Sequence, residues 1–256
     1  MSTADEVEVP RVLRLLWGLE KPSRRGPKPG LSLDAIADAA VRLADAEGLA
    51  AVSMSRVAGE LGFSTMSLYR YVDSKDDLLL VMANAGYGRP ELHHGPRAAW
   101  RTRLEEWARA MRAGLQAHPW LLEIPVSEPP LAPNPLAWME AGLQALSATP
   151  LREQEKLSAM LLTDTFVRGQ TQLALQVDAA ARRSGSTPQE ADARYARVLG
   201  QLVTPDTHPG LVGALSSGSL EDGGDDFADT EFAFGLKVVM DGIAGLVEAR
   251  ARRAGT

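Results

Sequence analysis

Apolar residues along this chain recur at intervals of three and four positions, the spacing that places them on one face of a helix. No segment shows a convincing alternation of apolar and polar residues, the mark of a half-buried strand. Aromatic residues make up only 5% of the sequence, while Ala, Leu, Arg and Glu are abundant. Pattern and composition together predict an all-α fold.

Four short helices are predicted within residues 32–85. Each begins after a serine, a residue type whose hydroxyl caps a helix N-terminus: Ser32, Ser53, Ser64 and Ser74. Gly48 and Gly62 follow the first and second helices, where a left-handed C-cap belongs. Asp77 lies three residues after Ser74 and predicts a capping box there. The second and third helices are therefore joined by a very tight turn.

A larger helical body follows a break in the pattern at residues 86–95. The spacing predicts helices over residues 97–117, 136–146, 150–183, 189–202 and 229–253. Asn134 and Pro135 make a good N-cap and N1 pair for the second of them. Residues 125–135 and 203–228 are rich in Pro, Gly or acidic residues and are predicted to be loops. We divide the chain into an N-terminal extension with a basic arm, a domain of short helices and a larger C-terminal domain: residues 1–31, 32–88 and 89–256.

The composition excludes several classes of protein. The 256 residues include no cysteine, which excludes a disulfide scaffold and thiolate zinc sites and fits a reducing cytoplasm. No stretch approaches the roughly 20 apolar residues of a membrane helix, so we expect a soluble cytoplasmic protein with no membrane partner. The net charge of −6 argues against general coating of nucleic acid, although a local basic patch remains compatible with it.

Two short helices joined by a tight glycine-containing turn form a helix-turn-helix, whose second helix lies in the DNA major groove. If Leu68 and Val72 face inward, the helical period turns the other side chains of that helix outward. These DNA-facing candidates are Thr65, Met66, Ser67, Tyr69, Arg70 and Tyr71. Arginine can read guanine, hydroxyls and methionine can reach base edges, and tyrosine can bind phosphate. Lys75 lies beside exposed helix amides that favour a phosphate. The alternative is a small helical domain without a DNA-binding role.

The amino-acid sequence of this region resembles that of a known protein family. Residues 61–72 read LGFSTMSLYRYV and residues 74–79 read SKDDLL. Residues 46–49 (AEGL) and 53–58 (SMSRVA) precede them at helical positions. Over residues 32–85 the chain resembles the tetracycline-repressor (TetR/AcrR) family of bacterial transcription regulators.

This resemblance implies a homodimer whose N-terminal domains bind a palindromic operator in double-stranded DNA. It also implies that the C-terminal helices bind a small effector, which releases the DNA. The DNA contacts it implies are at Ser53, Arg56, Thr65, Met66, Ser67, Tyr69, Tyr71 and Lys75. The chain departs from the commoner family pattern at Ser55, where Arg is frequent, and at Tyr71, which is often His.

The charges add a second candidate for DNA contact. Residues 32–85 carry eight acidic side chains and only four basic ones (Arg42, Arg56, Arg70 and Lys75), a poor footprint for a DNA reader. Residues 11–31, in contrast, carry six basic side chains and one acidic one. We therefore expect a flexible basic arm whose Arg24, Arg25 and Lys28 enter the adjacent minor groove. The alternative is a solvated linker.

The C-terminal body contains no catalytic arrangement, phosphate loop or metal motif, so we expect no enzyme activity, metal or cofactor. Large apolar residues lie on elements that resemble the family's pocket-forming helices, with ordinary core packing as the alternative: Trp107, Met111, Trp120, Trp138, Met160 and Phe166. Asp164 is either a pocket carboxylate or is neutralised by Arg168 four residues on. We expect an apolar or amphipathic effector. A tetracycline–magnesium chelate is not expected, because Leu173 falls near the position of that repressor's chelating Glu.

The last helix carries two apolar stripes. The first consists of large residues: Phe232, Leu236, Val239, Ile243 and Val247. The second consists mostly of small ones: Gly235, Val238, Gly242, Gly245 and Ala249. Small residues let helix backbones approach closely, so we assign the second stripe to a twofold dimer interface, with the preceding long helix completing a four-helix bundle. The alternative is that both stripes are buried within one subunit.

These patterns, together with what the family resemblance implies, predict a cytoplasmic bacterial repressor that binds DNA through a helix-turn-helix and responds to a ligand. One alternative is a protein that binds or scavenges a small molecule and whose helix-turn-helix no longer reads DNA. Another is a constitutive DNA binder without an effector.

Overall fold

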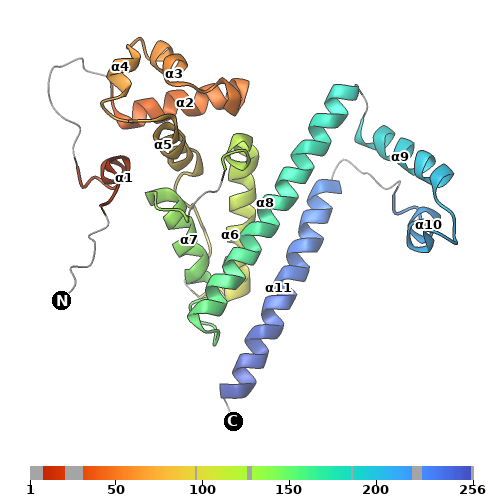
Figure 1. Cartoon of the computed structure of the whole chain (residues 1–256). Helices are drawn as coiled ribbons and strands as arrows, with labels where there is room; N and C mark the ends of the chain where they lie inside the picture. Colours follow the sequence, from red (N-terminus) through yellow and green to blue (C-terminus); the bar gives the residue numbers. More distant parts are fainter. Residues whose placement is uncertain are drawn as a thin grey trace, which may run out of the picture. The chain divides into compact units, whose positions relative to one another are not determined.

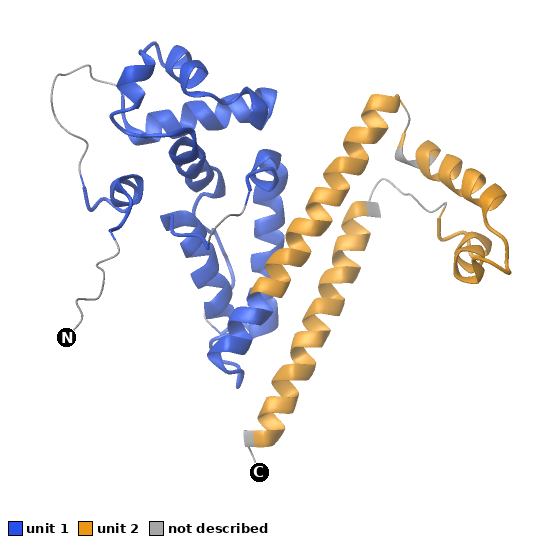
Figure 2. Cartoon of the chain, viewed as in Figure 1, with its two compact units in different colours: residues 1–160 blue, residues 161–256 orange. Residues whose placement is uncertain are grey.

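The computed structural model describes residues 8–20, 31–95, 97–125, 129–185, 187–220 and 227–254. Within these residues every regular element is a helix, which confirms the predicted all-α fold (Figure 1). None of the described helices is long and apolar enough to cross a membrane. The chain divides into two compact units, residues 1–160 and 161–256, shown in different colours in Figure 2.

The short helices predicted in residues 32–85 are all present, with a single 3-10 turn between the first two. Their bounds are α2 Leu33–Glu47, η1 Leu49–Ala51, α3 Met54–Glu60, α4 Thr65–Leu68 and α5 Lys75–Tyr87. Three of the predicted serine caps form, because the hydroxyl of each accepts a backbone N–H three residues on: Ser32, Ser53 and Ser74. The local signals in the sequence therefore place the starts of these helices correctly. Helix α4 is shorter than predicted, because it ends at Leu68 and does not reach Val72.

Two capping details differ from the prediction. The hydroxyl of Ser64 bonds to the hydroxyl of Ser67 at 3.0 Å and caps no amide. The reason is that the backbone N–H of Ser67 already donates to the carbonyl of Ser64 at 2.9 Å. At α5, the carboxylate of Asp77 accepts from the N–H of Asp73 at 2.9 Å, so the reciprocal bond of the capping box reaches one residue before the cap.

The core of this region is formed where α2 lies along α5. Residues predicted to face inward are buried in it, among them Ile36, Leu68, Val72 and Leu78, each 0% exposed. Burial of several such side chains is the main term that stabilises so small a helical cluster. The core therefore fixes the position of α4 through Leu68 and Val72.

An unpredicted helix, α1 (Arg11–Leu16), precedes this cluster. No helix was predicted here, although Val12, Leu13 and Leu15 are buried and α1 contacts α5. The flexible basic strand predicted over residues 24–30 lies outside the described part of the chain. The run of apolar residues in α1 gives the segment a face that docks on the rest of the first unit. A six-residue helix gains its stability from such docking and not from its own hydrogen bonds.

The first unit continues with α6 (Trp100–Ala117), η2 (Pro119–Leu122) and α7 (Pro133–Ala145). Trp107 is at its centre: the indole N–H donates to the carbonyl of Trp138 at 2.8 Å, and the two rings meet edge to face at 6.2 Å. Gly142 lies against both Trp107 and Met160, where a Cβ atom would come within 2.7 Å of Met160 Cγ. These contacts pack α6, α7 and the first turns of the next helix closely.

Helix α7 begins earlier than predicted, with Ala132 as its N-cap and Pro133 at N1. Asn134 is therefore inside the first turn. Its backbone N–H donates to Asn84 Oδ1 at 2.9 Å and its side-chain amide donates to the Asn84 carbonyl at 2.8 Å. The two prolines fit because the first turn of a helix has no intrahelical N–H bond to lose.

Helix α8 (Glu153–Ser184) begins in the first unit and continues in the second, which also contains α9 (Pro188–Leu202), α10 (Pro209–Ser216) and α11 (Phe227–Ala254). The loop predicted over residues 203–228 is wrong for α10. Pro209 at N1 starts this helix, and the apolar residues that follow it tolerate helical backbone despite two glycines. In the second unit α8 and α11 pack through the rings of Phe166 and Phe232, 5.4 Å apart.

The close approach of α5 to η2 gives a stability prediction. A Cβ atom at Gly86 would lie 2.5 Å from Cη2 of Trp120, whose ring is rigid and only 2% exposed. We expect Gly86→Ala to lower the free energy of unfolding by about 1–3 kcal/mol through overpacking. Gly114→Ala in α6 is the matched control, because its Cβ meets open space; it should be neutral or stabilise by up to about 1 kcal/mol. Denaturant unfolding of both variants decides, and a Gly86→Ala protein as stable as the control would contradict the packing described.

Candidate DNA interface and effector region

A tight turn between α3 and α4 sets the geometry of the candidate DNA interface. Gly62 has a φ of 71°, in the left-handed region that glycine enters without a Cβ clash. The N–H of Phe63 then donates to the carbonyl of Ala58 at 2.9 Å. Together with the buried Leu68, this turn holds α4 against α3 in the arrangement of a helix-turn-helix.

The outer side of α4 and its C-terminal end is exposed. Met66 is 72% and Tyr69 is 44% exposed, and Arg70 next to it is exposed as well. Thr65 and Ser67 are half-buried. A methionine can contact a thymine methyl, a phenol can bind a phosphate, and a guanidinium can bind a guanine edge. This exposed segment carries all three groups. Base and phosphate contacts by these residues stay predictions.

Arg56, at the start of α3, is held by an acidic residue of α2. Its guanidinium donates through two nitrogens to the two carboxylate oxygens of Glu47, at 2.8 and 2.6 Å. These hydrogen bonds raise the pKa of Arg56 and lower the pKa of Glu47. Ser53 caps α3 through the Arg56 N–H, and its hydroxyl also bonds to that of Ser55. A DNA phosphate at this helix start has to compete with Glu47 for Arg56.

Two further predicted DNA contacts have partners or neighbours within the unit. The hydroxyl of Tyr71 donates to the carbonyl of Leu31 at 2.8 Å, so it fixes the residue that precedes α2. Lys75 is exposed at the first residue of α5, beside Asp76 and Asp77 in the same turn. Those carboxylates already interact favourably with the helix N-terminus and oppose a phosphate there. The predicted arm residues lie outside the described part of the chain: Arg24, Arg25 and Lys28.

Five of the predicted effector residues belong to the first unit, and all of them are buried: Trp107, Met111, Trp120, Trp138 and Met160. Trp107 and Met160 come together at Gly142, and Trp107 also bonds to Trp138. Trp120 lies elsewhere, with its indole N–H donating to Asp45 of α2 at 2.6 Å and its ring against Gly86 of α5. Trp120 therefore connects η2 to the DNA-binding helices, and a role for it in effector contact stays a prediction.

The other two predicted effector residues lie on α8 in the second unit. The guanidinium of Arg168 donates to Asp164 at 2.8 Å, and a role of Asp164 in effector contact stays a prediction. The ring of Phe166 packs against Phe232 and against Gly235, where a Cβ atom would come within 2.5 Å of it. Among the described residues no cluster of three or more His, Asp or Glu side chains could hold a metal ion.

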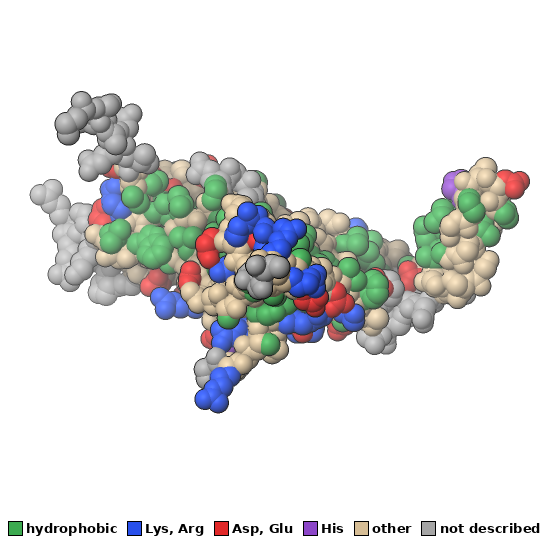
Figure 3. Space-filling view, turned by 90° about the horizontal axis from the view of Figure 1, so that it is seen from below, with side chains coloured by type: hydrophobic (Ala, Val, Ile, Leu, Met, Phe, Trp, Pro, Cys, Tyr) green, Lys and Arg blue, Asp and Glu red, His purple; other side chains and the backbone are tan. Residues whose placement is uncertain are grey.

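The two stripes of α11 have different surroundings. Phe232, Leu236 and Ile243 of the large-residue stripe are buried. In the small-residue stripe Gly235 serves the contact with Phe166, whereas a Cβ at Gly242 or Gly245 would meet nothing within 4 Å. Val238 in the same stripe is 54% exposed, and Ala249 is half-buried. Hydrophobic side chains are also visible among charged ones over the face of the chain drawn in Figure 3. The dimer role of this stripe stays a prediction.

Two family descriptions match the chain in succession. Residues 36–82, which contain the helix-turn-helix, match the description "Bacterial regulatory proteins, tetR family". Residues 93–247, more than half of the chain, match "Tetracyclin repressor-like, C-terminal domain". The chain belongs to the tetR family.

Similar proteins agree with a tetR-family transcription regulator. A protein named "HTH-type transcriptional repressor DrrR1", from Streptomyces coeruleorubidus, is 38% identical over 97% of this chain and 90% of its own length. "HTH-type transcriptional repressor Rv1353c", from Mycobacterium tuberculosis, is 25% identical over 91% of this chain and 87% of its own. The tetR family protein ActR of Streptomyces coelicolor, solved in complex with actinorhodin, is 27% identical with a TM-score of 0.69, over 86% of this chain and 99% of its own.

Sequence reasoning missed several residues that position these tetR-family elements. Asp45 accepts hydrogen bonds from both Trp120 and His118, residues more than 70 positions away, and no local pattern marks such a partner. Asn84 escaped notice for the same reason. Arg11 had a local signal, because it opens a short run with helical spacing of apolar residues.

The pairing of Arg56 generates a DNA-binding prediction. Glu47→Gln removes the carboxylate that holds the guanidinium, so we expect tighter binding to all DNA sequences alike. If the released Arg56 gains one phosphate, the plot of log affinity against log salt becomes steeper by about 0.9. Asp38→Asn, on the same helix, removes an equal charge without touching the Arg56 pair and should leave the slope unchanged. If salt titration gives equal slopes for the two variants, Arg56 contacts no DNA phosphate in either of them.

The same pair predicts an acid-dependent contribution to stability. The pKa of Glu47 lies below its ordinary value of 4.5 in the folded chain. Its contribution is therefore fully present above the unfolded-state pKa and disappears as the pH falls through the lowered folded-state pKa. We expect the thermal midpoints of the unmodified protein and Glu47→Gln to differ near neutral pH and to converge in acid. A difference that is independent of pH would contradict the ion pair.

Proposed function

We propose that this chain is a homodimeric repressor that binds a palindromic operator and releases it when an apolar or amphipathic small molecule binds its C-terminal helices. The observation that carries the proposal is the placement of α4, anchored by the buried Leu68 and Val72 with Met66, Tyr69 and Arg70 exposed beside them. A repressor of chromosomal genes acts in the cytoplasm, and this function needs no catalytic step.

The dimer interface proposed here is formed by α8 and α11. Both helices carry exposed apolar side chains in the second unit: Leu162, Leu173, Val177, Phe234, Val238 and Leu246. The open positions at Gly242 and Gly245 leave the backbone of α11 accessible for close packing. An exposed apolar surface on two long, packed helices favours burial against a second copy in a four-helix bundle. A twofold dimer presents two recognition helices, which is why the operator is palindromic.

Effector release requires a connection between the C-terminal helices and the helix-turn-helix. The contacts at η2 and α7 supply one: Trp120 bonds to Asp45 of α2, and Asn134 bonds doubly to Asn84 of α5. An effector that moves α6 or α7 therefore displaces α2 and α5 directly. Such an effector acts only to the extent that it binds the released geometry more tightly than the DNA-bound one.

Footprinting on the intergenic DNA beside the gene tests the proposal, followed by electrophoretic shifts with candidate effectors. We expect protected half-sites whose centres lie about one helical turn, roughly 34 Å, or somewhat more apart. Actinorhodin is the first effector to try, because the similar protein ActR has been solved with it. A chain that binds ligands without any footprint would be a scavenger, and a footprint that no ligand weakens would indicate a constitutive DNA binder.

The open glycine stripe gives a prediction for the dimer. A Cβ atom at Gly242 meets nothing within 4 Å, so we expect the subunit to fold with Gly242→Leu. Across a twofold interface the added side chain is felt twice, at about 1–3 kcal/mol each. We expect weakened dimers and much poorer operator affinity, although no DNA-facing residue has changed.

Glu248→Leu is the control for this variant, because it adds a leucine to the solvent-exposed side of the same helix. It should leave the sedimentation behaviour and the operator affinity unchanged. If Gly242→Leu is also fully dimeric with normal DNA affinity, the small-residue stripe is not the interface.

A further inference from the structure

The short helix α1 is fixed to the first unit by more than apolar contact. Its buried Val12, Leu13 and Leu15 dock it, and side chains at both ends of the segment donate hydrogen bonds to other parts of the first unit. A helix of this length has almost no stability alone, so its position is set by those contacts. The parts of the unit that α1 contacts therefore indicate its role.

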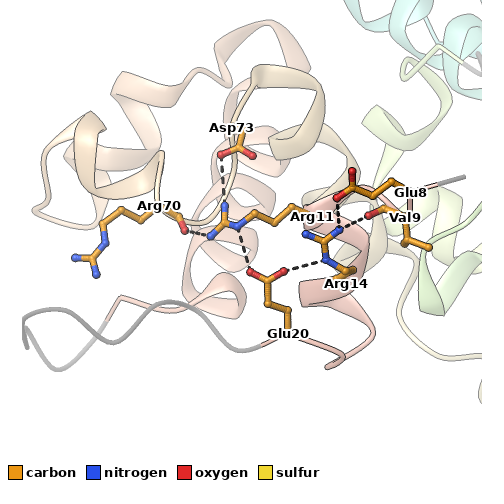
Figure 4. A network of polar contacts seen from close by, with 7 residues as sticks. All are labelled: Glu8, Val9, Arg11, Arg14, Glu20, Arg70 and Asp73. Carbon is orange, nitrogen blue, oxygen red and sulfur yellow. Dashed lines mark hydrogen bonds and ion pairs between the residues drawn. The ribbon is translucent and has the colours of Figure 1, made fainter. Parts of the chain in front are cut away.

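At one end, Arg11 reaches the C-terminal end of the recognition helix (Figure 4). Its guanidinium donates to the backbone carbonyl of Arg70 at 2.6 Å and lies 3.4 Å from the carboxylate of Asp73. Arg70 is the second residue after α4, so this charge-assisted bond holds the backbone just beyond the helix. Arg11 thus holds the point where the chain leaves α4.

Glu20 supports this contact from behind. Its carboxylate lies 3.5 Å from Arg11 and 3.0 Å from Arg14, and the hydrogen bond from Arg14 lowers its pKa. Arg14 also bonds to Glu8 and to the carbonyl of Val9, and none of these side-chain contacts reaches α4. The side chain of Arg14 therefore bonds only within residues 8–20, whereas Arg11 connects this segment to the residues that follow the recognition helix.

At the other end, the residue that follows α1 is bonded to the loop that leads into α7. The indole N–H of Trp17 donates to the carbonyl of Leu131 at 3.0 Å, two residues before α7 begins. Both anchors lie within residues 1–160, so they belong to one compact unit.

We propose that α1 is a brace between the recognition helix and the start of α7, with Arg11 as a positioning residue for operator recognition and Trp17 as the second anchor. The proposal rests on the operator binding proposed above. Base contacts need each side chain at a defined place, whereas phosphate attraction tolerates displacement. Loss of the brace should therefore reduce binding to the operator much more than binding to random DNA.

The test compares Arg11→Gln with Arg14→Gln in the full-length protein. Both remove one positive charge from α1, so their effect on phosphate attraction is the same. We expect Arg11→Gln to lower the ratio of operator affinity to random-DNA affinity by about tenfold, the scale of one charge-assisted hydrogen bond. Arg14→Gln should change the ratio less than about twofold. Arg11→Lys, which can still donate to the Arg70 carbonyl, should recover part of the loss.

A double-mutant cycle tests the bridge itself. Trp17→Phe keeps an aromatic ring at this position and removes the indole N–H donor. If α1 is one brace, breaking either end releases it, so Arg11→Gln combined with Trp17→Phe should lose no more discrimination than the stronger single variant. Additive losses would show two independent contacts and would overturn the brace.

The outcomes are distinguishable from a failure of the repressor proposal. If the unmodified protein does not prefer its operator, the proposed function fails. If it does, and Arg11→Gln discriminates equally well, only the brace is refuted. Amide exchange over residues 65–72 keeps the idea testable even if Arg11→Gln is less stable. Exchange should accelerate in this segment relative to the core of α5, and a uniform acceleration would refute a specific role.

Discussion

The indole of Trp120 is the contact on which the arrangement of the first unit depends. Its N–H donates to Asp45 at 2.6 Å while its ring lies against the backbone of Gly86, so one side chain joins η2 to both α2 and α5. A buried indole N–H requires an acceptor, and a carboxylate gives it a strong one. The helix-turn-helix and the helices that follow it are therefore attached at a defined angle. The bonds from Trp138 to the carbonyls of Tyr87 and Gly88 extend the same attachment along α5.

Local chemistry made much of the fold predictable, and long-range packing made the rest unpredictable. Ser32, Ser53 and Ser74 mark helix starts because capping involves residues three positions apart, which a sequence displays directly. The position of α7 could not be read in this way, because Asn134 looks like a cap and instead bonds to Asn84, 50 positions earlier. Helix α1 was missed because it is stable only when docked.

The candidate sites follow the same division. Exposure of Met66 and Arg70 and burial of Leu68 follow from helical period alone, so the DNA-facing side of α4 was readable. The engagement of Arg56 with Glu47 was not, because both residues are ordinary surface types until folding brings them together. Some of the arginines whose positive charge was expected to attract DNA are therefore paired with carboxylates, Arg11 and Arg14 among them. Placement of the recognition helix then matters more than total charge.

The glycines of α11 lower the intrinsic stability of that helix. Each glycine in an exposed helix interior costs roughly 1 kcal/mol relative to alanine, and Gly242 and Gly245 lie within one turn of each other. A helix weakened at its middle retains its shape best when a neighbour covers it. If a second copy is that neighbour, the order of α11 rises with the amount of protein present, since association stabilises only the folded form. The abundance of the chain in the cell would then set how much of it is ready to bind DNA.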